Sequence, residues 1–327
     1  MPLVLLMLAV MMPVLLIATV SCGSGNNSVK APELQELAIT TDSSWQRYPA
    51  LSGTTIVWQN RDEYTIIYHD MTTSANFVVR SGQGLATDPD ISGNTIVWAD
   101  KRSGNWDIYG YDIVTKTEFP ICTNPADQSS PAIDGNLVVW ADNRNSNPDI
   151  YGYDLNSHTE FTICTDRADQ DNPEVSRNII VWADKRNEAW DIYGYDYLAK
   201  TDFRITDQPG DQLDPSISGS TVVWVDLHKS SGDIYGTDLE IGENFSICTS
   251  KGDQETPSVD GKMVIWRDHR KNNWDIYGYD MSTQEEFPIC TNLADQWRPA
   301  ISHDTVVWMD KRNGNWDIYG ANLPPKG

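Results

Sequence analysis

Short runs of apolar residues, each followed by turn-forming residues, return along this chain at a nearly constant interval. The clearest landmark is an aliphatic residue followed by tryptophan, which occurs at Trp58, Trp98, Trp140, Trp182, Trp224, Trp266 and Trp308. The first interval is 40 residues and the five later intervals are 42 residues each. A fixed period of this length is typical of repeat architectures, in which each repeat is one supersecondary unit. The sequence therefore predicts seven copies of one structural unit.

Each repeat contains four short strand-like segments, which the second repeat shows most clearly. They span residues 89–92, 95–98, 107–111 and 118–122, and turns that contain Gly, Asn or Lys separate them. The segment Ile96-Val97-Trp98 is continuously apolar, which is typical of a strand buried on both faces. Four strands in a repeat of this length match the blade of a β-propeller, where neighbouring blades cover both faces of each sheet.

The two ends of the repeated region are incomplete in a complementary way. The last repeat stops at Gly327 without its fourth strand, and residues 37–41 match the fourth-strand segment 287–291. We therefore predict that the N-terminal strand closes the ring, which removes exposed strand edges. The predicted fold is all-β, a seven-bladed β-propeller of four-stranded blades over residues 36–327. A solenoid built from the same repeats would instead need polar capping repeats at its ends.

The repeat resembles a known family in sequence as well as in period. Residues 134–140 carry the pattern Asp-Gly-x-x-Val-x-Trp, and residues 144–151 carry Arg-x-x-Asn-Pro-Asp-Ile-Tyr. These patterns are similar to the WD-repeat-like units of TolB-type propellers, and the resemblance extends from Leu37 to Tyr319. The chain departs from TolB itself, because it shows seven predicted blades rather than six and no separate N-terminal α/β domain. The resemblance implies a scaffold that binds other proteins or ligands through the faces of the ring, usually without catalysis.

The N-terminal residues differ in composition from the repeats. Residues 3–20 are apolar and uncharged, and small residues around Cys22 follow them, as in an export signal. The arrangement resembles a bacterial-type lipoprotein signal, in which the Cys at the cleavage point is lipidated. We therefore predict a signal peptide over residues 1–22, with Cys22 as the lipidation site, and a flexible tether over residues 23–35. The alternative is a retained membrane anchor, since the apolar run is near the lower limit of spanning length.

The net charge argues against a nucleic-acid partner, and the cysteine positions argue against disulfides between repeats. The chain carries 24 Lys and Arg against 47 Asp and Glu, a formal net charge of −23, so we expect no nucleic-acid partner. Cys122, Cys164, Cys248 and Cys290 occupy one and the same position in four repeats. Equivalent positions on adjacent repeats lie a whole repeat width apart, beyond the ~7 Å that a disulfide allows between Cα atoms. We expect free, mostly buried thiols, with Thr206 at the same position in another repeat.

Two sets of polar residues recur on one face of the predicted ring. The hairpins between second and third strands contain Asp-x-Arg, at residues 100–102, 142–144, 184–186, 268–270 and 310–312. The connections between blades contain Asp-Gln, at residues 127–128, 169–170, 211–212, 253–254 and 295–296. Because these residues return in nearly every repeat, we expect them to satisfy turn amides and to pair charges across blades. The alternative is a divalent cation bound by the Asp oxygens, but no calcium-loop pattern is present and we assign no metal site.

Four tryptophans stand at the ends of these hairpins, directly before Asp-Ile-Tyr: Trp106, Trp190, Trp274 and Trp316. Exposed flat rings flanked by Asp and Asn suit stacking on sugars or contact with a protein partner, so we predict them as ligand-binding residues. The alternative is that each ring covers its own hairpin or stacks on an Arg side chain.

Glycines occupy an unfavourable position inside the third strand of six repeats: Gly110, Gly152, Gly194, Gly236, Gly278 and Gly320. Gly in a strand interior indicates the close approach of a large neighbour. We expect that neighbour to be the indole of the aliphatic-Trp landmark.

An enzyme should break the repeat, because one active site needs unique residues rather than seven copies. The sequence contains no Gly-x-Ser-x-Gly, His-Glu-x-x-His or phosphate-binding Gly loop. His228 and His269 interrupt adjacent hairpins, but two His without a third ligand rarely form a metal site. We therefore predict no catalytic residue and no cofactor.

Taken together, these features favour an exported, non-enzymatic scaffold that binds a protein or polysaccharide of the cell envelope on its hairpin face. The expected location is the cell surface, the periplasm or the extracellular space, with membrane anchoring through the N-terminus. One alternative is a glycan-cleaving enzyme, which would need carboxylates with raised pKa at the mouth of the channel. The other is a purely architectural envelope component that has no ligand.

Overall fold

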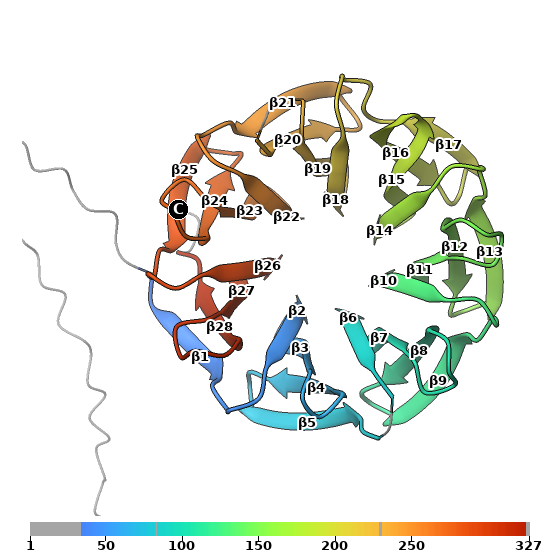
Figure 1. The fold of residues 1–327 in the computed structure, drawn as a ribbon, viewed down its shortest axis with the longest axis horizontal. Helices are drawn as coiled ribbons and strands as arrows, with labels where there is room; N and C mark the ends of the chain where they lie inside the picture. Colours follow the sequence, from blue (N-terminus) through green and yellow to red (C-terminus); the bar gives the residue numbers. More distant parts are fainter. Residues whose placement is uncertain (1–33, 83, 229–230, 325–327) are drawn as a thin grey trace, which may run out of the picture. The chain divides into compact units, whose positions relative to one another are not determined.

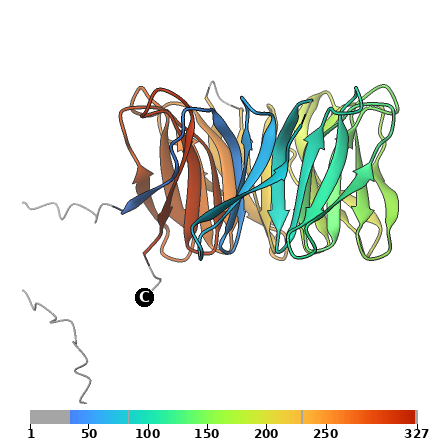
Figure 2. The ribbon, with the colours of Figure 1, turned by 90° about the horizontal axis from the view of Figure 1, so that it is seen from below.

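The computed structural model describes residues 34–82, 84–228 and 231–324. These residues form seven four-stranded sheets arranged as blades around a central axis (Figure 1). In the perpendicular view the strands run between two layers of loops (Figure 2). The predicted all-β, seven-bladed propeller is therefore confirmed. The described residues include no helix that could cross a membrane, and the predicted signal peptide with Cys22 lies outside them.

The strands follow the chain, four to a blade. Blade 1 consists of β2 (Gln46–Ser52), β3 (Thr55–Asn60), β4 (Thr65–Asp70) and β5 (Ala75–Arg80). Blade 2 consists of β6 (Ala86–Ser92), β7 (Thr95–Asp100), β8 (Asp107–Asp112) and β9 (Thr117–Cys122). Blade 3 consists of β10 (Gln128–Asp134), β11 (Leu137–Asp142), β12 (Asp149–Asp154) and β13 (Thr159–Cys164). Blade 4 consists of β14 (Gln170–Ser176), β15 (Ile179–Asn187), β16 (Ala189–Asp196) and β17 (Thr201–Arg204).

The remaining blades complete the ring. Blade 5 consists of β18 (Gln212–Ser218), β19 (Thr221–Asp226), β20 (Asp233–Asp238) and β21 (Glu243–Cys248). Blade 6 consists of β22 (Gln254–Asp260), β23 (Met263–Asp268), β24 (Asp275–Asp280) and β25 (Glu285–Cys290). Blade 7 consists of β26 (Gln296–Ser302), β27 (Thr305–Asp310), β28 (Asp317–Asn322) and β1 (Glu36–Thr40). The strands nearest the axis are β2, β6, β10, β14, β18, β22 and β26 (Figure 1).

The core consists of apolar layers between neighbouring blades. In blade 2, Ile96 and Trp98 of β7 pack toward blade 1, and Val97 packs toward blade 3. Successive side chains of a strand point to opposite faces of its sheet, so a continuous Ile-Val-Trp run covers both faces, as predicted. The tryptophans of this run are at most 1% exposed in all seven blades. Full burial of each aliphatic neighbour contributes roughly 1.5–3 kcal/mol.

The strand glycines correct one expectation about the core. A Cβ atom on Gly110 would lie 2.5 Å from the ring of Phe119 in β9, and one on Gly152 would lie 2.5 Å from the ring of Phe161. In five blades the close neighbour is therefore a phenylalanine of the outer strand and not the buried tryptophan, and at Gly320 it is the backbone of Val306. In blade 1, where Tyr68 replaces the glycine, the ring of Phe77 stacks on Tyr68 at a centroid distance of 4.8 Å.

The N-terminal strand closes the ring, as predicted. β1 pairs antiparallel with β28 as the outer strand of blade 7. Glu36 of β1 forms an ion pair with Arg312 at 2.5 Å, and Glu160 of the outer strand β13 pairs with Arg144 at 2.6 Å in blade 3. β1 therefore takes the place of the missing fourth strand, both in its backbone pairing and in the ion pair between an outer-strand Glu and the hairpin Arg.

We expect a chain that begins at Thr41 to have a lower thermal midpoint than a chain that begins at Leu34. The shorter chain lacks β1 and leaves Arg312 without its outer-strand partner, while it keeps the turn at Asp42. A loss of 1 kcal/mol shifts the midpoint of a domain this large by roughly 2–4 °C, so several degrees are expected. Differential scanning calorimetry of the two chains measures the shift. Equal midpoints would show that β1 contributes nothing to closure.

Candidate functional site

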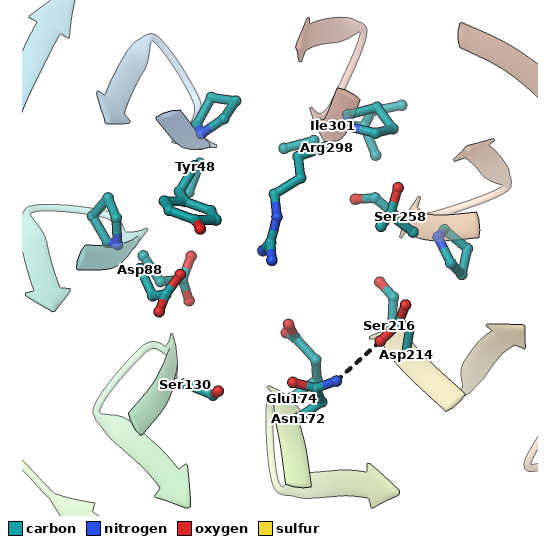
Figure 3. Close-up of a pocket in the computed structure, with 18 of the residues that line it drawn as sticks. Tyr48, Asp88, Ser130, Asn172, Glu174, Asp214, Ser216, Ser258, Arg298 and Ile301 are labelled. Carbon is teal, nitrogen blue, oxygen red and sulfur yellow. Dashed lines mark hydrogen bonds between the residues drawn. The ribbon is translucent and has the colours of Figure 1, made fainter. Parts of the chain in front are cut away.

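A cavity of about 390 Å³ lies on the axis of the ring (Figure 3). Every blade contributes residues from the middle of its innermost strand to the wall of this cavity. Each of these strands places a proline there: Pro49, Pro89, Pro131, Pro173, Pro215, Pro257 and Pro299. The cavity therefore brings together side chains from all seven repeats.

The residue before each proline has a left-handed backbone. Its φ lies between 47° and 53° at Tyr48, Asp88, Ser130, Asn172, Asp214, Thr256 and Arg298. Positive φ is uncommon outside Gly, and a residue that precedes proline normally adopts an extended conformation. The pairing of the first two strands shifts its register here in every blade, as at a β-bulge. Bulges redirect side chains, and Figure 3 shows Tyr48, Asp88 and Arg298 directed into the cavity.

The seven repeats share this backbone but not its side chains. From blade 1 to blade 7, the residue before proline is Tyr, Asp, Ser, Asn, Asp, Thr and Arg. The residue after proline is Asp90 in blade 2 and Glu174 in blade 4, and it is Ala or Ser in the other five. The cavity is therefore chemically asymmetric inside a nearly symmetric ring.

Desolvation raises the pKa of the carboxyl groups that line the cavity. Burial, followed by the charge of Asp90, raises the pKa of Glu174 to about 8. Burial raises the pKa of Asp90 to about 6, although its carboxylate accepts a hydrogen bond of 2.8 Å from the backbone N–H of Ile133. The Glu174 side chain has water-accessible surface, which it presents to the cavity.

Two further carboxylates and one guanidinium face the same cavity. Burial raises the pKa of Asp88 and of Asp214, and the charge of Arg298 counteracts part of both shifts. The guanidinium carbon of Arg298 lies 4.4 Å from the ring centroid of Tyr48. Among the residues that the structure describes, no ion pair joins Arg298 to a carboxylate, whereas Asp214 accepts a hydrogen bond of 3.0 Å from Asn172. Opposite charges thus face one cavity without pairing.

The residues predicted from the sequence do not include those of the cavity. The signal is present, because the position before proline varies from Tyr to Arg within an otherwise regular repeat. This variation cannot be interpreted from the sequence alone, because a strand pattern does not show that a bulge turns the position before proline toward the axis.

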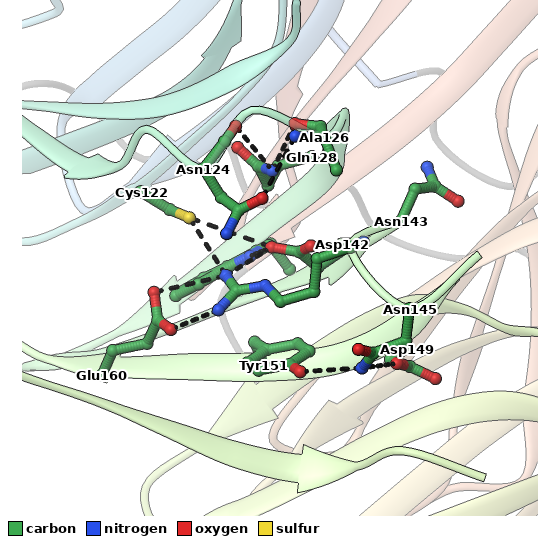
Figure 4. A network of polar contacts seen from close by, with 12 residues as sticks. Cys122, Asn124, Ala126, Gln128, Asp142, Asn143, Asn145, Asp149, Tyr151 and Glu160 are labelled. Carbon is green, nitrogen blue, oxygen red and sulfur yellow. Dashed lines mark hydrogen bonds and ion pairs between the residues drawn. The ribbon is translucent and has the colours of Figure 1, made fainter. Parts of the chain in front are cut away.

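On the hairpin face, the recurring Asp and Arg form a polar network in five of the seven blades, shown for blade 3 in Figure 4. The indole N–H of Trp140 donates to Asp142 Oδ2 at 3.0 Å, and the same oxygen accepts from Arg144 at 2.6 Å. Arg144 also pairs with Glu160, and its guanidinium lies 4.0 Å from the ring centroid of Tyr151. Asp142 is fully buried, so its carboxylate serves the hairpin rather than a ligand.

The same Trp-Asp-Arg arrangement returns in blades 2, 4, 6 and 7. The predicted structural role is confirmed, but the predicted charge pairing across blades is wrong for all five hairpin Arg residues, because each pairs within its own blade. Arg80 of blade 1, which takes the cysteine position, does pair across blades, with Asp100 of blade 2 at 2.9 Å. The four predicted free thiols are buried, as is Thr206.

The connections between blades are structural as well. Asp127 accepts a hydrogen bond of 2.9 Å from the backbone N–H of Trp106, and the backbone N–H of Gln128 donates to the Trp106 carbonyl at 2.9 Å. These bonds attach each hairpin to the connection that follows its blade. The described part of the chain contains no group of three His, Cys, Asp or Glu that could hold a metal ion. His228 binds Asp226 of its own hairpin.

The four predicted tryptophans are less exposed than the sequence indicates. Trp316 is 7% exposed, and Trp106, Trp190 and Trp274 are half-buried. Trp106 and Trp190 pack on the apolar layer between their own blade and the next, and Trp316 does so between blades 7 and 1. A lysine of the same hairpin lies over each of these three rings, at 5.4 to 5.6 Å from the ring centroid.

Blades 6 and 7 add an aromatic feature that the repeat pattern does not reveal. The Arg267 guanidinium lies 4.3 Å from the Trp274 ring centroid and 4.4 Å from that of Trp297. Trp297 in turn lies 5.4 Å from Trp316. We call Trp274, Arg267, Trp297 and Trp316 the aromatic ladder. Trp297 is 37% exposed, and the equivalent position in the other six blades holds no aromatic residue.

No family model matches this chain, and no curated protein matches it in sequence. Solved structures do resemble it. TolB of Acinetobacter baumannii has a TM-score of 0.56 and 18% identity over 72% of this chain, which covers 62% of the TolB chain. Oligogalacturonate lyase of Vibrio parahaemolyticus has a TM-score of 0.70 and 12% identity, with 89% of this chain and 94% of that chain covered.

A third similar structure is the β-propeller domain of the Trilobed protease from Pyrococcus furiosus, which has an open velcro topology. Its TM-score is 0.69 at 14% identity, with 86% of this chain and 94% of that domain covered. Identities this low establish a shared fold, and this fold occurs in TolB and in enzymes alike. The chain is thus a seven-bladed β-propeller with a TolB-like fold, as the repeat sequence indicated.

Proposed function

We propose that the protein is an exported, non-enzymatic binding module, which takes a protein or polysaccharide of the cell envelope on its hairpin face. The observation that carries this proposal is the aromatic ladder, because it gives one place on a repetitive face an exposed indole, Trp297. Large aromatic side chains in a polar surround dominate the binding energy of many interfaces. Export follows from the leader pattern over residues 1–22.

The ladder is suited to binding because its rings are held in place before a partner arrives. Arg267 lies between Trp274 and Trp297, and it also forms an ion pair with Glu255. A side chain that is already ordered loses less conformational entropy on binding. Leu293, on the connection between blades 6 and 7, is 95% exposed and adds apolar surface to the same face.

The net charge narrows the class of partner. A chain with a formal net charge of −23 attracts cationic surfaces and repels anionic ones over distances up to the Debye length. We therefore propose a neutral or basic partner, with sugar rings or apolar protein side chains stacked on Trp297. Of the four tryptophans proposed from the sequence, Trp274 and Trp316 belong to the ladder, and Trp106 and Trp190 lie in other blades.

We expect Trp297→Ala to weaken binding of the envelope partner by about 30-fold or more, since truncation of a hot-spot aromatic costs at least ~2 kcal/mol. The measurement is recovery of partners from envelope extract on the immobilised protein, together with retention of the protein on insoluble polysaccharides. Trp106→Ala is the matched control, because Trp106 is a half-buried hairpin tryptophan outside the ladder.

Unchanged recovery and retention by Trp297→Ala would rule out the ladder as the contact. An equal loss in Trp106→Ala would mean that the partner covers the whole hairpin face, as the sequence alone predicts.

The second candidate function is cleavage of a glycan, and the carboxyl groups of the cavity favour it. Glycoside hydrolysis uses one protonated carboxyl as acid and one carboxylate as base or nucleophile. A cavity in which the pKa of Glu174 is raised further than that of Asp90 supports these two roles near neutral pH. Cleavage of a glycan by the wild type, and its loss in Glu174→Gln, would support this function.

The protonation of Glu174 gives a pH-dependent prediction that needs no substrate. Because its pKa in the folded protein is above that of the unfolded chain, its contribution to stability is present below about pH 4.5 and is lost as pH rises through about 8. The thermal midpoint of the wild type should therefore fall relative to that of Glu174→Gln between about pH 5 and about pH 9. Glu243→Gln, on the exposed outer strand β21, should follow the wild type. Parallel profiles for wild type and Glu174→Gln would contradict the raised pKa.

A further inference from the structure

The axial cavity differs from the hairpin networks in that, among the described residues, no ion pair joins its charged side chains. Its lining includes Asp88, Asp90, Glu174 and Asp214 but only one basic residue, Arg298. In the hairpins, by contrast, Arg and Asp meet at 2.6 Å in five blades. The same chain therefore pairs its charges where they support the fold and leaves them unpaired around the cavity.

Arg298 presents a binding group for an anion. Its guanidinium stacks on Tyr48 and, within the described chain, makes no hydrogen bond or ion pair. Stacking on an aromatic ring fixes the plane of a guanidinium and leaves its N–H groups at the edge free to donate. A planar guanidinium matches the two oxygens of a carboxylate. Figure 3 shows this group reaching toward the centre of the cavity.

The other walls present binding groups for a cation. Glu174 and Asp214 approach the centre of the cavity from blades 4 and 5, and Asp88 approaches it from blade 2 (Figure 3). Asp214 is oriented by Asn172, which donates to Oδ1 at 3.0 Å, and Asp90 is oriented by the backbone N–H of Ile133. Carboxylates held close together repel one another, and an ammonium group placed among them would remove that cost.

We propose that the axial cavity binds a small zwitterion with a second positive charge, of the kind represented by a basic amino acid. Its carboxylate binds the Arg298 guanidinium, and its ammonium groups lie among Asp88, Asp90, Glu174 and Asp214. Four acidic residues against one basic residue match a ligand whose own net charge is positive. A cavity of about 390 Å³ is in the size range of small-molecule sites.

The site is independent of the proposed function on the hairpin face. Arg298 lines the cavity, whereas its neighbour Trp297 and the other residues of the aromatic ladder do not. Failure of partner binding at the ladder and failure of ligand binding in the cavity can therefore be told apart, because either can occur without the other.

Isothermal titration of the full chain with three probes tests the proposal. L-lysine carries both ammonium groups and the carboxylate, cadaverine is the same diamine without the carboxylate, and L-glutamate has the opposite net charge. We expect saturable binding of L-lysine, binding of cadaverine at least ~10-fold weaker, and the weakest binding for L-glutamate. Absence of saturable L-lysine binding, or equal affinities for L-lysine and cadaverine, would overturn the proposal.

Substitutions assign the two ends of the ligand. Arg298→Gln should weaken L-lysine binding at least ~10-fold and change cadaverine binding by less than about threefold, because only the carboxylate contact is lost. Asp214→Asn should weaken both ligands. Arg177→Gln is the matched control, since Arg177 is an exposed arginine outside the cavity.

Folding of the variants is checked by their thermal midpoints. If Arg298→Gln does not fold, Arg298→Lys keeps the charge and removes the planar fork, and it should still weaken L-lysine more than cadaverine. Equal effects of Arg298→Gln on the two ligands, or unchanged L-lysine affinity, would show that Arg298 does not bind the carboxylate and would overturn the zwitterion assignment.

Discussion

The hydrogen bond from a buried indole to a buried carboxylate is the constraint on which the hairpins of this propeller depend. A buried tryptophan needs an acceptor for its N–H group, and Asp142 supplies it to Trp140 at 3.0 Å. A fully buried carboxylate in turn needs a cation, which Arg144 supplies from the same hairpin. Removal of one partner from a buried ion pair costs roughly 3–5 kcal/mol. The buried tryptophan therefore determines which polar residues its hairpin needs, an Asp and an Arg.

The blades that lack this arrangement show how the constraint relaxes. In blade 1, Asn60 replaces the Asp, and in blade 5, Asp226 binds His228 instead. The indole N–H groups of Trp58 and Trp224 are buried without a hydrogen-bond partner. An unsatisfied buried donor costs about 1–3 kcal/mol, which five networked blades and seven apolar layers can support. The ring thus tolerates local defects because its core is divided among many interfaces.

The symmetry of the ring also decides where function can be. Hairpin charges are used in folding, so a binding site has to come from positions that the repeat leaves unconstrained. Two such positions stand side by side on the innermost strand of blade 7: Trp297, which extends the aromatic ladder, and Arg298, which enters the cavity. The bulge before proline keeps the strand geometry the same in every blade, so the side chain it presents is free to differ.

The sequence by itself determined the number of blades, the closing strand, the buried tryptophans and the free thiols. These properties follow from the period and from the alternation of side chains within one strand, which are local. The tertiary structure alone decided that Phe119 fills the space at Gly110, that Trp316 is covered, and that Arg298 faces carboxylates of other blades. Exposure and pairing depend on how blades pack against one another and around the axis, and a period along the chain does not encode those contacts.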